Sequence, residues 1–256
     1  MKILFLGDIV GKKGREAIRD FLPELNKKYS PDFVIANGEN AAHGKGITKK
    51  IYDEILSYGV NAITMGNHTF SKKEILDFLP ELDNLICPIN HISRQGTGYR
   101  TYTINNEKLC IVNCLGTCMQ EEYTTSPYKA MDDVLNETKK DNIDYYLVDL
   151  HAEATAEKRV FAEYYKNRVS AVLGTHTHIQ TADEQLLNNM GFITDVGMCG
   201  PYDSIIGRDI DECIDRMVNK IETKYTISLN DPILCGIYLE FNNHKCTKIE
   251  RIQIKP

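Results

Sequence analysis

The sequence predicts an α/β fold in which mixed β-sheets form a sandwich that helices flank. Short apolar runs alternate with helical segments in the first part of the chain, and pairs of longer strands follow later. In addition, five of the short runs end directly before a side chain that can bind a metal ion. Because parallel strands bring their carboxyl ends to one edge of a sheet, we expect a metal site at that edge.

The chain has 256 residues, a length that suits one large domain, and we expect a single domain over 1–256. We find no internal repeat and no linker rich in Pro, Gly or Ser. The segment around 118–143 is the least regular, and it is expected to be a loop or a small cap over the site. The formal net charge of −6 does not favour binding to extended nucleic acid, so the expected partner is a small molecule.

Two features of the composition bear on the compartment. No apolar run approaches the roughly 18 residues that a membrane-spanning helix needs, so no membrane partner is expected. The eight cysteines form no CxxC pair and most lie in apolar runs, which is typical of reduced, buried thiols rather than of a zinc site. We therefore expect a cytoplasmic protein.

The first half of the chain contains three short apolar runs and three helical patterns. Ser71 and Glu74 have the spacing of a capping box, which predicts that a helix begins there. Strands are expected at Lys2–Leu6, Phe33–Ala36 and Ala62–Met65, and helices at Arg15–Lys28, with a Pro23 that can kink it, and near Lys49–Tyr58.

The second half is richer in strands. A β-hairpin is expected where two strands flank the Asn105–Asn106 turn. The expected strands are Tyr99–Ile104, Lys108–Asn113, Tyr145–Leu150, Ala171–Leu173, Phe192–Thr194, Ile233–Phe241 and Cys246–Ile254, with helices near Ala154–Asn167 and Asp211–Lys224.

The residues that follow the strands carry the chemistry. Taken singly, several have a simple structural explanation: Asp8 can cap a helix, Glu39 can belong to a turn, and a lone His151 can be a hydrogen-bonded structural residue. The Gly-Thr-His-Thr-His run at 174–178 is more specific, because alternate histidines after a buried strand have few structural uses. The candidate set is Asp8, Glu39, Asn40, Asn67, His68, His151, His176 and His178.

This mixture of ligand types indicates which metals the site would accept. Carboxylate and amide oxygens combined with imidazole nitrogens suit Mn, Fe, Zn or Co better than Mg or Ca alone. The set also exceeds what one ion needs. Two ions that share a carboxylate, about 3.5–4 Å apart, would use all of it and would suit displacement at phosphorus.

These motifs resemble those of the calcineurin-like metallophosphoesterases. Gly-Asp at 7–8, Asn-Gly-Glu-Asn at 37–40, Gly-Asn-His at 66–68, His151 and the 174–178 run carry the resemblance, and it extends over the whole chain. The chain is most similar to the YmdB-like branch of bacterial phosphodiesterases. Three departures from the general pattern are typical of that branch: Val10 in place of a histidine, Thr69 in place of an acidic residue, and Glu39 in place of a bridging aspartate.

The resemblance implies a role for each candidate residue. Asp8, Glu39 and His178 would hold the first metal, with Asn40 as an additional candidate. Glu39 would bridge to the second metal, which Asn67, His151 and His176 would also hold. His68 would bind no metal and would protonate the leaving oxygen as a general acid.

The expected function is a dinuclear-metal-dependent phosphodiesterase that hydrolyses small phosphodiesters, namely cyclic nucleotides including 2′,3′-cyclic forms. The resemblance favours iron or manganese, with zinc or cobalt as alternatives, and it implies a homo-oligomer. Two other functions stay open at this point. One is a phosphomonoesterase with the same chemistry, and the other is a regulatory binding protein that retains the metal site.

Overall fold

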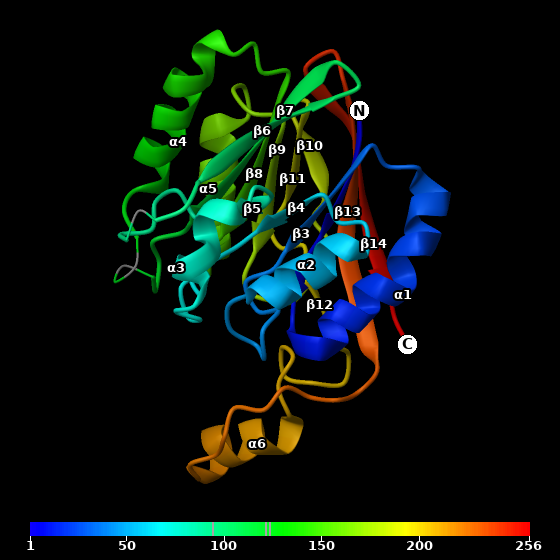
Figure 1. The fold of residues 1–256 in the computed structure, drawn as a ribbon, viewed down its shortest axis with the longest axis vertical. Helices are drawn as coiled ribbons and strands as arrows, with labels where there is room; N and C mark the ends of the chain where they lie inside the picture. Colours follow the sequence, from blue (N-terminus) through cyan, green and yellow to red (C-terminus); the bar gives the residue numbers. More distant parts are fainter. Residues whose placement is uncertain (94, 121, 123) are drawn as a thin grey trace.

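The computed structural model shows two β-sheets packed face to face with helices on both outer sides (Figure 1), and it describes residues 1–93, 95–120, 122 and 124–256. The elements are β1 (Lys2–Leu6), β2 (Asp8–Ile9), α1 (Gly11–Tyr29), β3 (Phe33–Asn37), α2 (Lys49–Ser57), β4 (Ala62–Thr64), α3 (Ile75–Phe78), β5 (Leu85–Ile86), β6 (Tyr99–Ile104), β7 (Glu107–Leu115), α4 (Pro127–Glu137), β8 (Tyr145–His151), α5 (Thr155–Tyr165), β9 (Ala171–Thr175), β10 (Gln185–Leu187), β11 (Met190–Ile193), β12 (Met198–Pro201), α6 (Ile210–Ile214), β13 (Pro232–Asn242) and β14 (Lys245–Ile254).

The first sheet has eight strands in the order β2-β12-β13-β1-β3-β4-β5, with β14 paired to β13. Strands β1, β3, β4 and β5 run parallel to one another, whereas β13 pairs antiparallel with β1, β12 and β14. The parallel part therefore directs the carboxyl ends of β1, β3 and β4 to one edge. The loops that carry Glu39 and Asn67 begin at that edge.

The second sheet has six strands in the order β10-β11-β9-β8-β7-β6. Its four central strands, β11, β9, β8 and β7, are parallel, and a hairpin strand adds antiparallel at each side. Because His151 and Thr175 are paired in register on β8 and β9, the carboxyl ends of these two strands lie at the same level. Both sheets are thus mixed, as the sequence predicted.

Alternation along the strands divides the core into layers. On β1, Ile3 and Phe5 point between the two sheets, where they meet Ile111 and Leu147 of the second sheet. Leu4 and Leu6 point the other way, against α1 and α2. A third cluster lies under α4 and α5 on the outer face of the second sheet. Both faces of the parallel strands are therefore buried, which explains their continuous apolar sequences.

Most expected elements are confirmed. The Asn105–Asn106 turn has positive φ at both residues, as a two-residue hairpin turn requires. Helix α1 starts at Gly11, earlier than expected, and Pro23 lies inside it. The capping-box prediction is wrong: α3 begins only at Ile75, and its first residues receive no side-chain cap. The helix expected at Asp211–Lys224 is shorter, because α6 ends in a single turn of π-helix at Asp215–Asn219.

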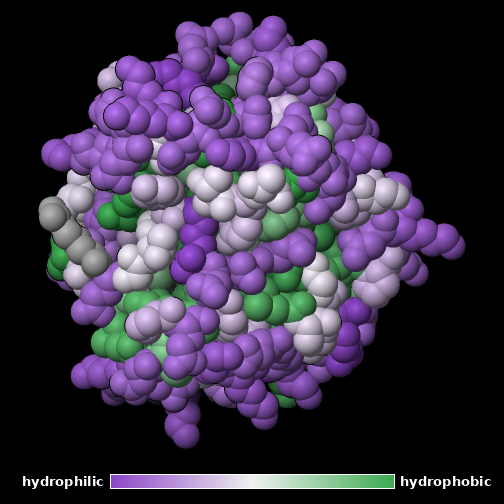
Figure 2. All heavy atoms as spheres, turned by 45° about the horizontal axis from the view of Figure 1, so that its top comes forward, coloured by the Kyte–Doolittle hydropathy of each residue, from purple (hydrophilic) through white to green (hydrophobic). Residues whose placement is uncertain are grey.

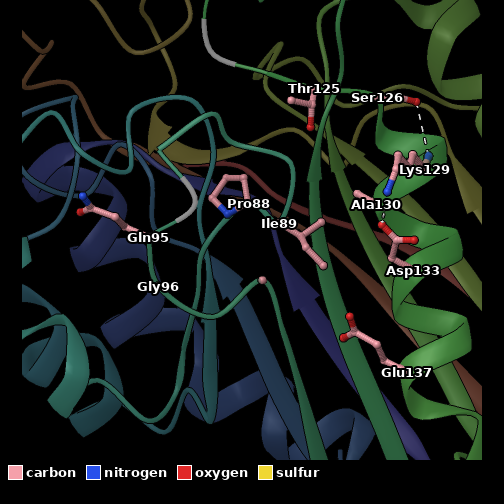
Figure 3. Close-up of a pocket in the computed structure, with 11 residues that line it drawn as sticks. Pro88, Ile89, Gln95, Gly96, Thr125, Ser126, Lys129, Ala130, Asp133 and Glu137 are labelled. Carbon is pink, nitrogen blue, oxygen red and sulfur yellow. Dashed lines mark hydrogen bonds and ion pairs between the residues drawn. The ribbon is translucent and has the colours of Figure 1, made fainter.

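The region expected to be a loop or small cap, 118–143, contains α4, while Glu121 and Tyr123 lie outside the described residues. A cavity of about 440 Å³ lies between α4 and the loop that follows β5 (Figure 3). Its charged lining residues already have partners, since Lys129 forms an ion pair with Asp133 and Glu137 accepts from the Tyr99 hydroxyl. None of the metal-binding candidates lines this cavity.

The remaining surface agrees with the composition. The face in Figure 2 is largely hydrophilic, with smaller apolar areas between the polar side chains. Among the helices of the described ranges, none is both long enough and apolar enough to cross a bilayer. The cysteines are free, and all except Cys118 and Cys213 are buried, which confirms the expected thiols.

Gly174 on β9 offers a test of the close packing behind the site. A Cβ at this position would lie 1.8 Å from the backbone oxygen of Thr194. We expect Gly174→Ala to lower the free energy of unfolding by about 1–3 kcal/mol, as overpacking does. Gly191→Ala on β11 is the control, because there the nearest contact is the Cys246 sulfur at 3.0 Å. Urea denaturation that gave equal losses for both variants would contradict this explanation.

Candidate metal centre

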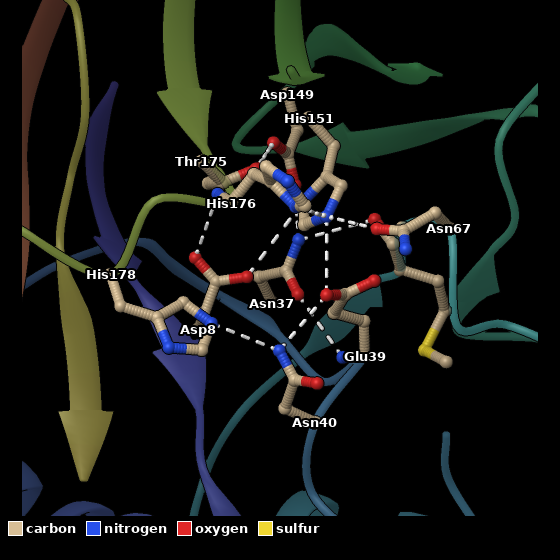
Figure 4. Close-up of polar contacts among 12 residues, drawn as sticks. Asp8, Asn37, Glu39, Asn40, Asn67, Asp149, His151, Thr175, His176 and His178 are labelled. Atoms are coloured by element: carbon tan, nitrogen blue, oxygen red, sulfur yellow. Dashed lines mark hydrogen bonds and ion pairs between the residues drawn. The ribbon is translucent and has the colours of Figure 1, made fainter. Parts of the chain in front are cut away.

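The predicted site residues converge where the carboxyl ends of both sheets meet (Figure 4). Asp8 lies on β2, and Glu39 and Asn67 follow β3 and β4 of the first sheet. The histidines come from the second sheet, His151 at the end of β8 and His176 and His178 after β9. Residues that are far apart in the chain thus form one polar cluster, although the surrounding strands are apolar.

Two groups within this cluster have the geometry of a metal site. The first consists of Asp8, Glu39 and His178, and the second of Glu39, His151 and His176. In each group, one ligand atom per residue lies within 4.8 Å of the others. Glu39 is the member common to both. This is the arrangement that two ions sharing one carboxylate require.

The spacing within the second group fits an ion more closely than it fits a hydrogen-bond network. His151 Nε2 lies 3.0 Å from His176 Nδ1, 3.1 Å from Asn67 Oδ1 and 3.2 Å from Glu39 Oε1. One ring nitrogen can give at most one hydrogen, so these three contacts cannot all be hydrogen bonds. Ligands about 2.1 Å from a common ion lie about 3 Å apart, so the observed spacing is that of a coordination shell.

A second observation supports the fit in the first group. Asp8 is fully buried, and its Oδ1 has no hydrogen-bond partner among the described residues. Its Oδ2 accepts from the backbone N–H of His176 at 3.2 Å. Asp8 Oδ1 lies 3.7 Å from His151 Nδ1, which is too far for a hydrogen bond. A buried carboxylate oxygen without a hydrogen bond is costly, and a cation between Asp8, Glu39 and His178 would remove that cost.

The three histidines are oriented by hydrogen bonds at their outer nitrogens. His176 Nε2 lies 3.0 Å from Glu153 Oε2, His178 Nδ1 donates to the Ile206 carbonyl at 2.9 Å, and His151 Nδ1 lies 2.9 Å from Thr175 Oγ1. These contacts direct His176 Nδ1, His178 Nε2 and His151 Nε2 towards the centre. Partners of this kind fix the ring and the tautomer of metal-binding histidines.

The loop that carries His176 and His178 has an unusual backbone conformation, and buried polar side chains hold it in place. His176 and His178 both have positive φ, at 101° and 67°. Asp195 accepts from the backbone and the hydroxyl of Thr177, and Lys158 binds both Asp195 and the Thr175 carbonyl. Lys158 and Asp195 are both buried, so this ion pair fixes the loop without solvent screening.

The charges of the cluster perturb one another strongly. Burial raises the pKa of Asp8 to about 7. Burial would also raise the pKa of Glu39, but the charge of His151 holds it below its ordinary value. For His151, burial opposes protonation, yet Glu39 and Asp8 raise its pKa to about 9. Burial and the neighbouring His151 lower the pKa of His176 to about 3. Divalent ions would compete with protons here.

Asn40 and His68 lie beside the two groups. Asn40 donates through Nδ2 to Glu39 Oε1 at 2.9 Å, and the same nitrogen lies 3.0 Å from His178 Nε2. Coordination by Asn40 would use its Oδ1 and stays a prediction. The backbone N–H of His68 donates to Glu39 Oε2 at 3.1 Å, and its ring lies 3.4 Å from Ser71 Oγ. Burial lowers the pKa of the His68 ring.

Several supporting residues escaped the sequence reasoning. Asn37, Asp149 and Thr175 form a buried hydrogen-bonded group beneath the candidate ligands (Figure 4). Glu153, which contacts His176, and the ion pair Lys158–Asp195 also hold the candidate ligands in place. Three of these residues had a signal in the sequence: Asp149 is an acidic residue inside the apolar run Tyr145–Leu150, and Asn37 and Thr175 lie in the Asn-Gly-Glu-Asn and Gly-Thr-His-Thr-His motifs. Glu153, Lys158 and Asp195 have no local pattern that marks them.

Comparisons with known proteins identify relatives over nearly the whole chain. A family model described as "YmdB-like protein" matches residues 4–252. The 2′,3′-cyclic-nucleotide 2′-phosphodiesterase of Bacillus subtilis (strain 168) is 42% identical over 258 residues, which cover 99% of this chain and 97% of that protein.

Solved structures extend the likeness to the fold. A structure described as a novel phosphatase, from Mycoplasma pneumoniae, is 36% identical and has a TM-score of 0.93, covering 99% of this chain and 93% of that one. A hypothetical protein from Thermus thermophilus is 34% identical, with a TM-score of 0.92 and 99% of both chains covered. A matching family model and relatives of this identity over almost the full length together show that the chain belongs to the YmdB-like protein family.

Proposed function

We propose that the chain is a metal-dependent phosphodiesterase that hydrolyses small phosphodiesters, including 2′,3′-cyclic nucleotides. The observation that carries this proposal is the pair of metal-binding groups that share Glu39. The name of the Bacillus subtilis relative, a 2′,3′-cyclic-nucleotide 2′-phosphodiesterase, supports the substrate class. The high identity over the full length supports transfer of the same reaction to this chain.

Two ions are proposed. The mixed oxygen and nitrogen donors suit iron, manganese, zinc or cobalt, and the family resemblance favours iron or manganese. When bound, the ions would lower the pKa of a water and neutralise charge on the phosphate. Asp8, Glu39 and His178 would hold one ion, with Asn40 as a further candidate. Glu39, Asn67, His151 and His176 would hold the other.

His68 is proposed to give a proton to the leaving oxygen. It lies beside the cluster, because its backbone N–H contacts Glu39, but its ring is not part of either metal-binding group. Burial lowers the pKa of this ring and favours its neutral form. An anionic phosphodiester next to the ring would counter that shift, because a nearby negative charge stabilises the imidazolium.

The direct test is hydrolysis of a panel of 2′,3′-cyclic nucleotides, 3′,5′-cyclic nucleotides and phosphomonoesters, with metal content measured on the same sample. We expect turnover of cyclic diesters that chelation abolishes and that Mn²⁺ or Fe²⁺ restores. Hydrolysis of monoesters alone would favour the phosphatase alternative. A fully metal-loaded protein that turned over none of them would favour the regulatory binding protein.

Glu39→Gln tests the shared carboxylate. A neutral amide cannot balance two divalent ions, so we expect metal occupancy and turnover to fall together. The fold should largely survive, which far-UV circular dichroism would check. Glu163→Gln is the control, because this carboxylate on α5 pairs with Arg159 and Lys166 on the outer face of the second sheet. Binding of two ions at wild-type affinity after Glu39→Gln would show that Glu39 does not bridge them.

His68→Ala separates proton transfer from metal binding. We expect both ions to remain bound while turnover falls by roughly 10²–10⁴-fold, the usual contribution of a general acid. The loss should shrink for a nitrophenyl ester, because its leaving group needs no proton. Steady-state kinetics with both classes of leaving group would decide. Equal losses for the two classes would assign His68 to phosphate positioning instead of proton donation.

Self-association, which the resemblance implies, and a cytoplasmic location, which the composition predicts, are part of the proposal. The segment between β12 and β13 projects from the sandwich (Figure 1) and exposes the apolar side chains of Ile214, Met217, Val218 and Ile221. A second copy of the chain that covered these side chains would remove apolar surface from water. Sedimentation velocity would measure the assembly.

A further inference from the structure

Beneath the candidate ligands lies a buried carboxylate that the proposed reaction does not use. Asp149 on β8 has an exposed fraction of 0%. Its Oδ1 accepts from the Thr175 hydroxyl at 2.6 Å, and its Oδ2 accepts from Asn37 Nδ2 at 2.9 Å. Among the ion pairs of the described residues, none gives Asp149 a Lys or Arg partner. Burying a carboxylate among neutral donors costs free energy, which suggests a role beyond filling the core.

The direction of the hydrogen bonds follows from the chemistry of the groups. The Thr175 hydroxyl has a single hydrogen, and it donates that hydrogen to Asp149 Oδ1. The Thr175 oxygen is then left as an acceptor for His151, whose Nδ1 lies 2.9 Å away. That contact requires a hydrogen on Nδ1. With the ring hydrogen on Nδ1, Nε2 of His151 would offer its lone pair to a metal ion in the centre, where Glu39, Asn67 and His176 surround it.

We propose that Asp149 is a positioning residue that, through the Thr175 hydroxyl, holds the His151 proton on Nδ1 and so keeps Nε2 available for a metal ion. This inference rests on the proposed metal site. Carboxylates that orient a metal-binding histidine usually contact it directly. Here the carboxylate acts across an intervening threonine, and the three residues lie on the paired strands β8 and β9.

Asn37 fixes the direction of the hydrogen bond at the other oxygen of Asp149. The Asn37 Oδ1 accepts from the backbone N–H of Glu39 at 3.1 Å, so this end of the amide is occupied. Its Nδ2 therefore faces Asp149 and the Met65 carbonyl as a donor. Asn37 belongs to β3 of the first sheet and Asp149 to β8 of the second. The same carboxylate thus joins the loop of Glu39 to the ring of His151.

This geometry gives Asp149→Asn a definite consequence. The Asn37 Nδ2 donor requires an acceptor, so the new amide must turn its oxygen towards Asn37. Its NH₂ group then faces Thr175 and donates to the hydroxyl oxygen. The Thr175 hydrogen would be driven towards His151 Nδ1, where it competes with the Nδ1 proton. Metal binding would then require the less favourable state of the ring.

The experiment is a double-mutant cycle in metal affinity, measured by calorimetric titration of the metal-free full chain with Mn²⁺. We expect Asp149→Asn to weaken Mn²⁺ binding by about 10–100-fold, the usual effect of losing such a partner. The same change in a Thr175→Val background should have little further effect on Mn²⁺ affinity, because valine has no hydroxyl whose hydrogen bond could change direction. Thr175→Ser should keep the affinity, while Thr175→Val alone lowers it.

The matched control is Asp132→Asn. Asp132 also accepts from a buried hydroxyl, that of Tyr165, and from Arg168, and these residues lie on the outer face of the second sheet, where they contact no candidate ligand among the described residues. This variant should lose stability without losing Mn²⁺ affinity. Thermal unfolding of all variants separates the two effects. If Asp149→Asn prevents folding, the comparison of Thr175→Ser with Thr175→Val still decides.

Two results would overturn the inference while the proposed function stands. One is an Asp149→Asn loss of equal size with and without the Thr175 hydroxyl, and the other is equal affinity for the Thr175→Ser and Thr175→Val proteins. Wild-type protein that bound no metal would instead overturn the proposed function, and this inference with it.

Discussion

The buried carboxylate of Glu39 is the constraint on which the rest of the site depends. It has an exposed fraction of only 1%, and its oxygens face partners from both sheets. Oε1 contacts Asn40 and His151, and Oε2 accepts from the backbone of His68. Gly66 makes this approach possible, because a Cβ there would lie 2.2 Å from Glu39 Oε2 and 2.4 Å from His151 Nε2. A charge placed this deeply must be balanced by cations.

The sandwich supplies rigid supports for that charge. The parallel strands of the two sheets present their carboxyl ends at a common edge, and apolar layers on both faces hold them there. The buried pair of Lys158 and Asp195 helps to hold the loop in which His176 and His178 adopt positive φ. Local strain at the site is therefore offset by packing and by hydrogen bonds beneath it.

A buried group of hydrogen-bonded polar side chains lies under the candidate ligands and limits their conformations. Thr175, Asp149 and Asn37 connect β9, β8 and β3, so the two sheets are joined by hydrogen bonds as well as by apolar contacts. Each member is fully buried and paired, which limits the ring of His151 and the loop of Glu39 to one arrangement. A site built on such a layer is preorganised for its ligand.

The sequence by itself determined the strands and the identity of the candidate ligands. Their signals are local: an apolar run followed by Asp8, Glu39 or His151 can be recognised from neighbouring residues alone. The capping-box prediction failed because the Ser71 side chain contacts the His68 ring. Ser71 therefore does not cap a helix, although its spacing from Glu74 suggested that it would. Tertiary structure alone decided the shared position of Glu39 and the partners of Asp149. The reason is physical: Asn37 and Asp149 meet across two sheets, and no short-range pattern records a contact made by folding over such a separation.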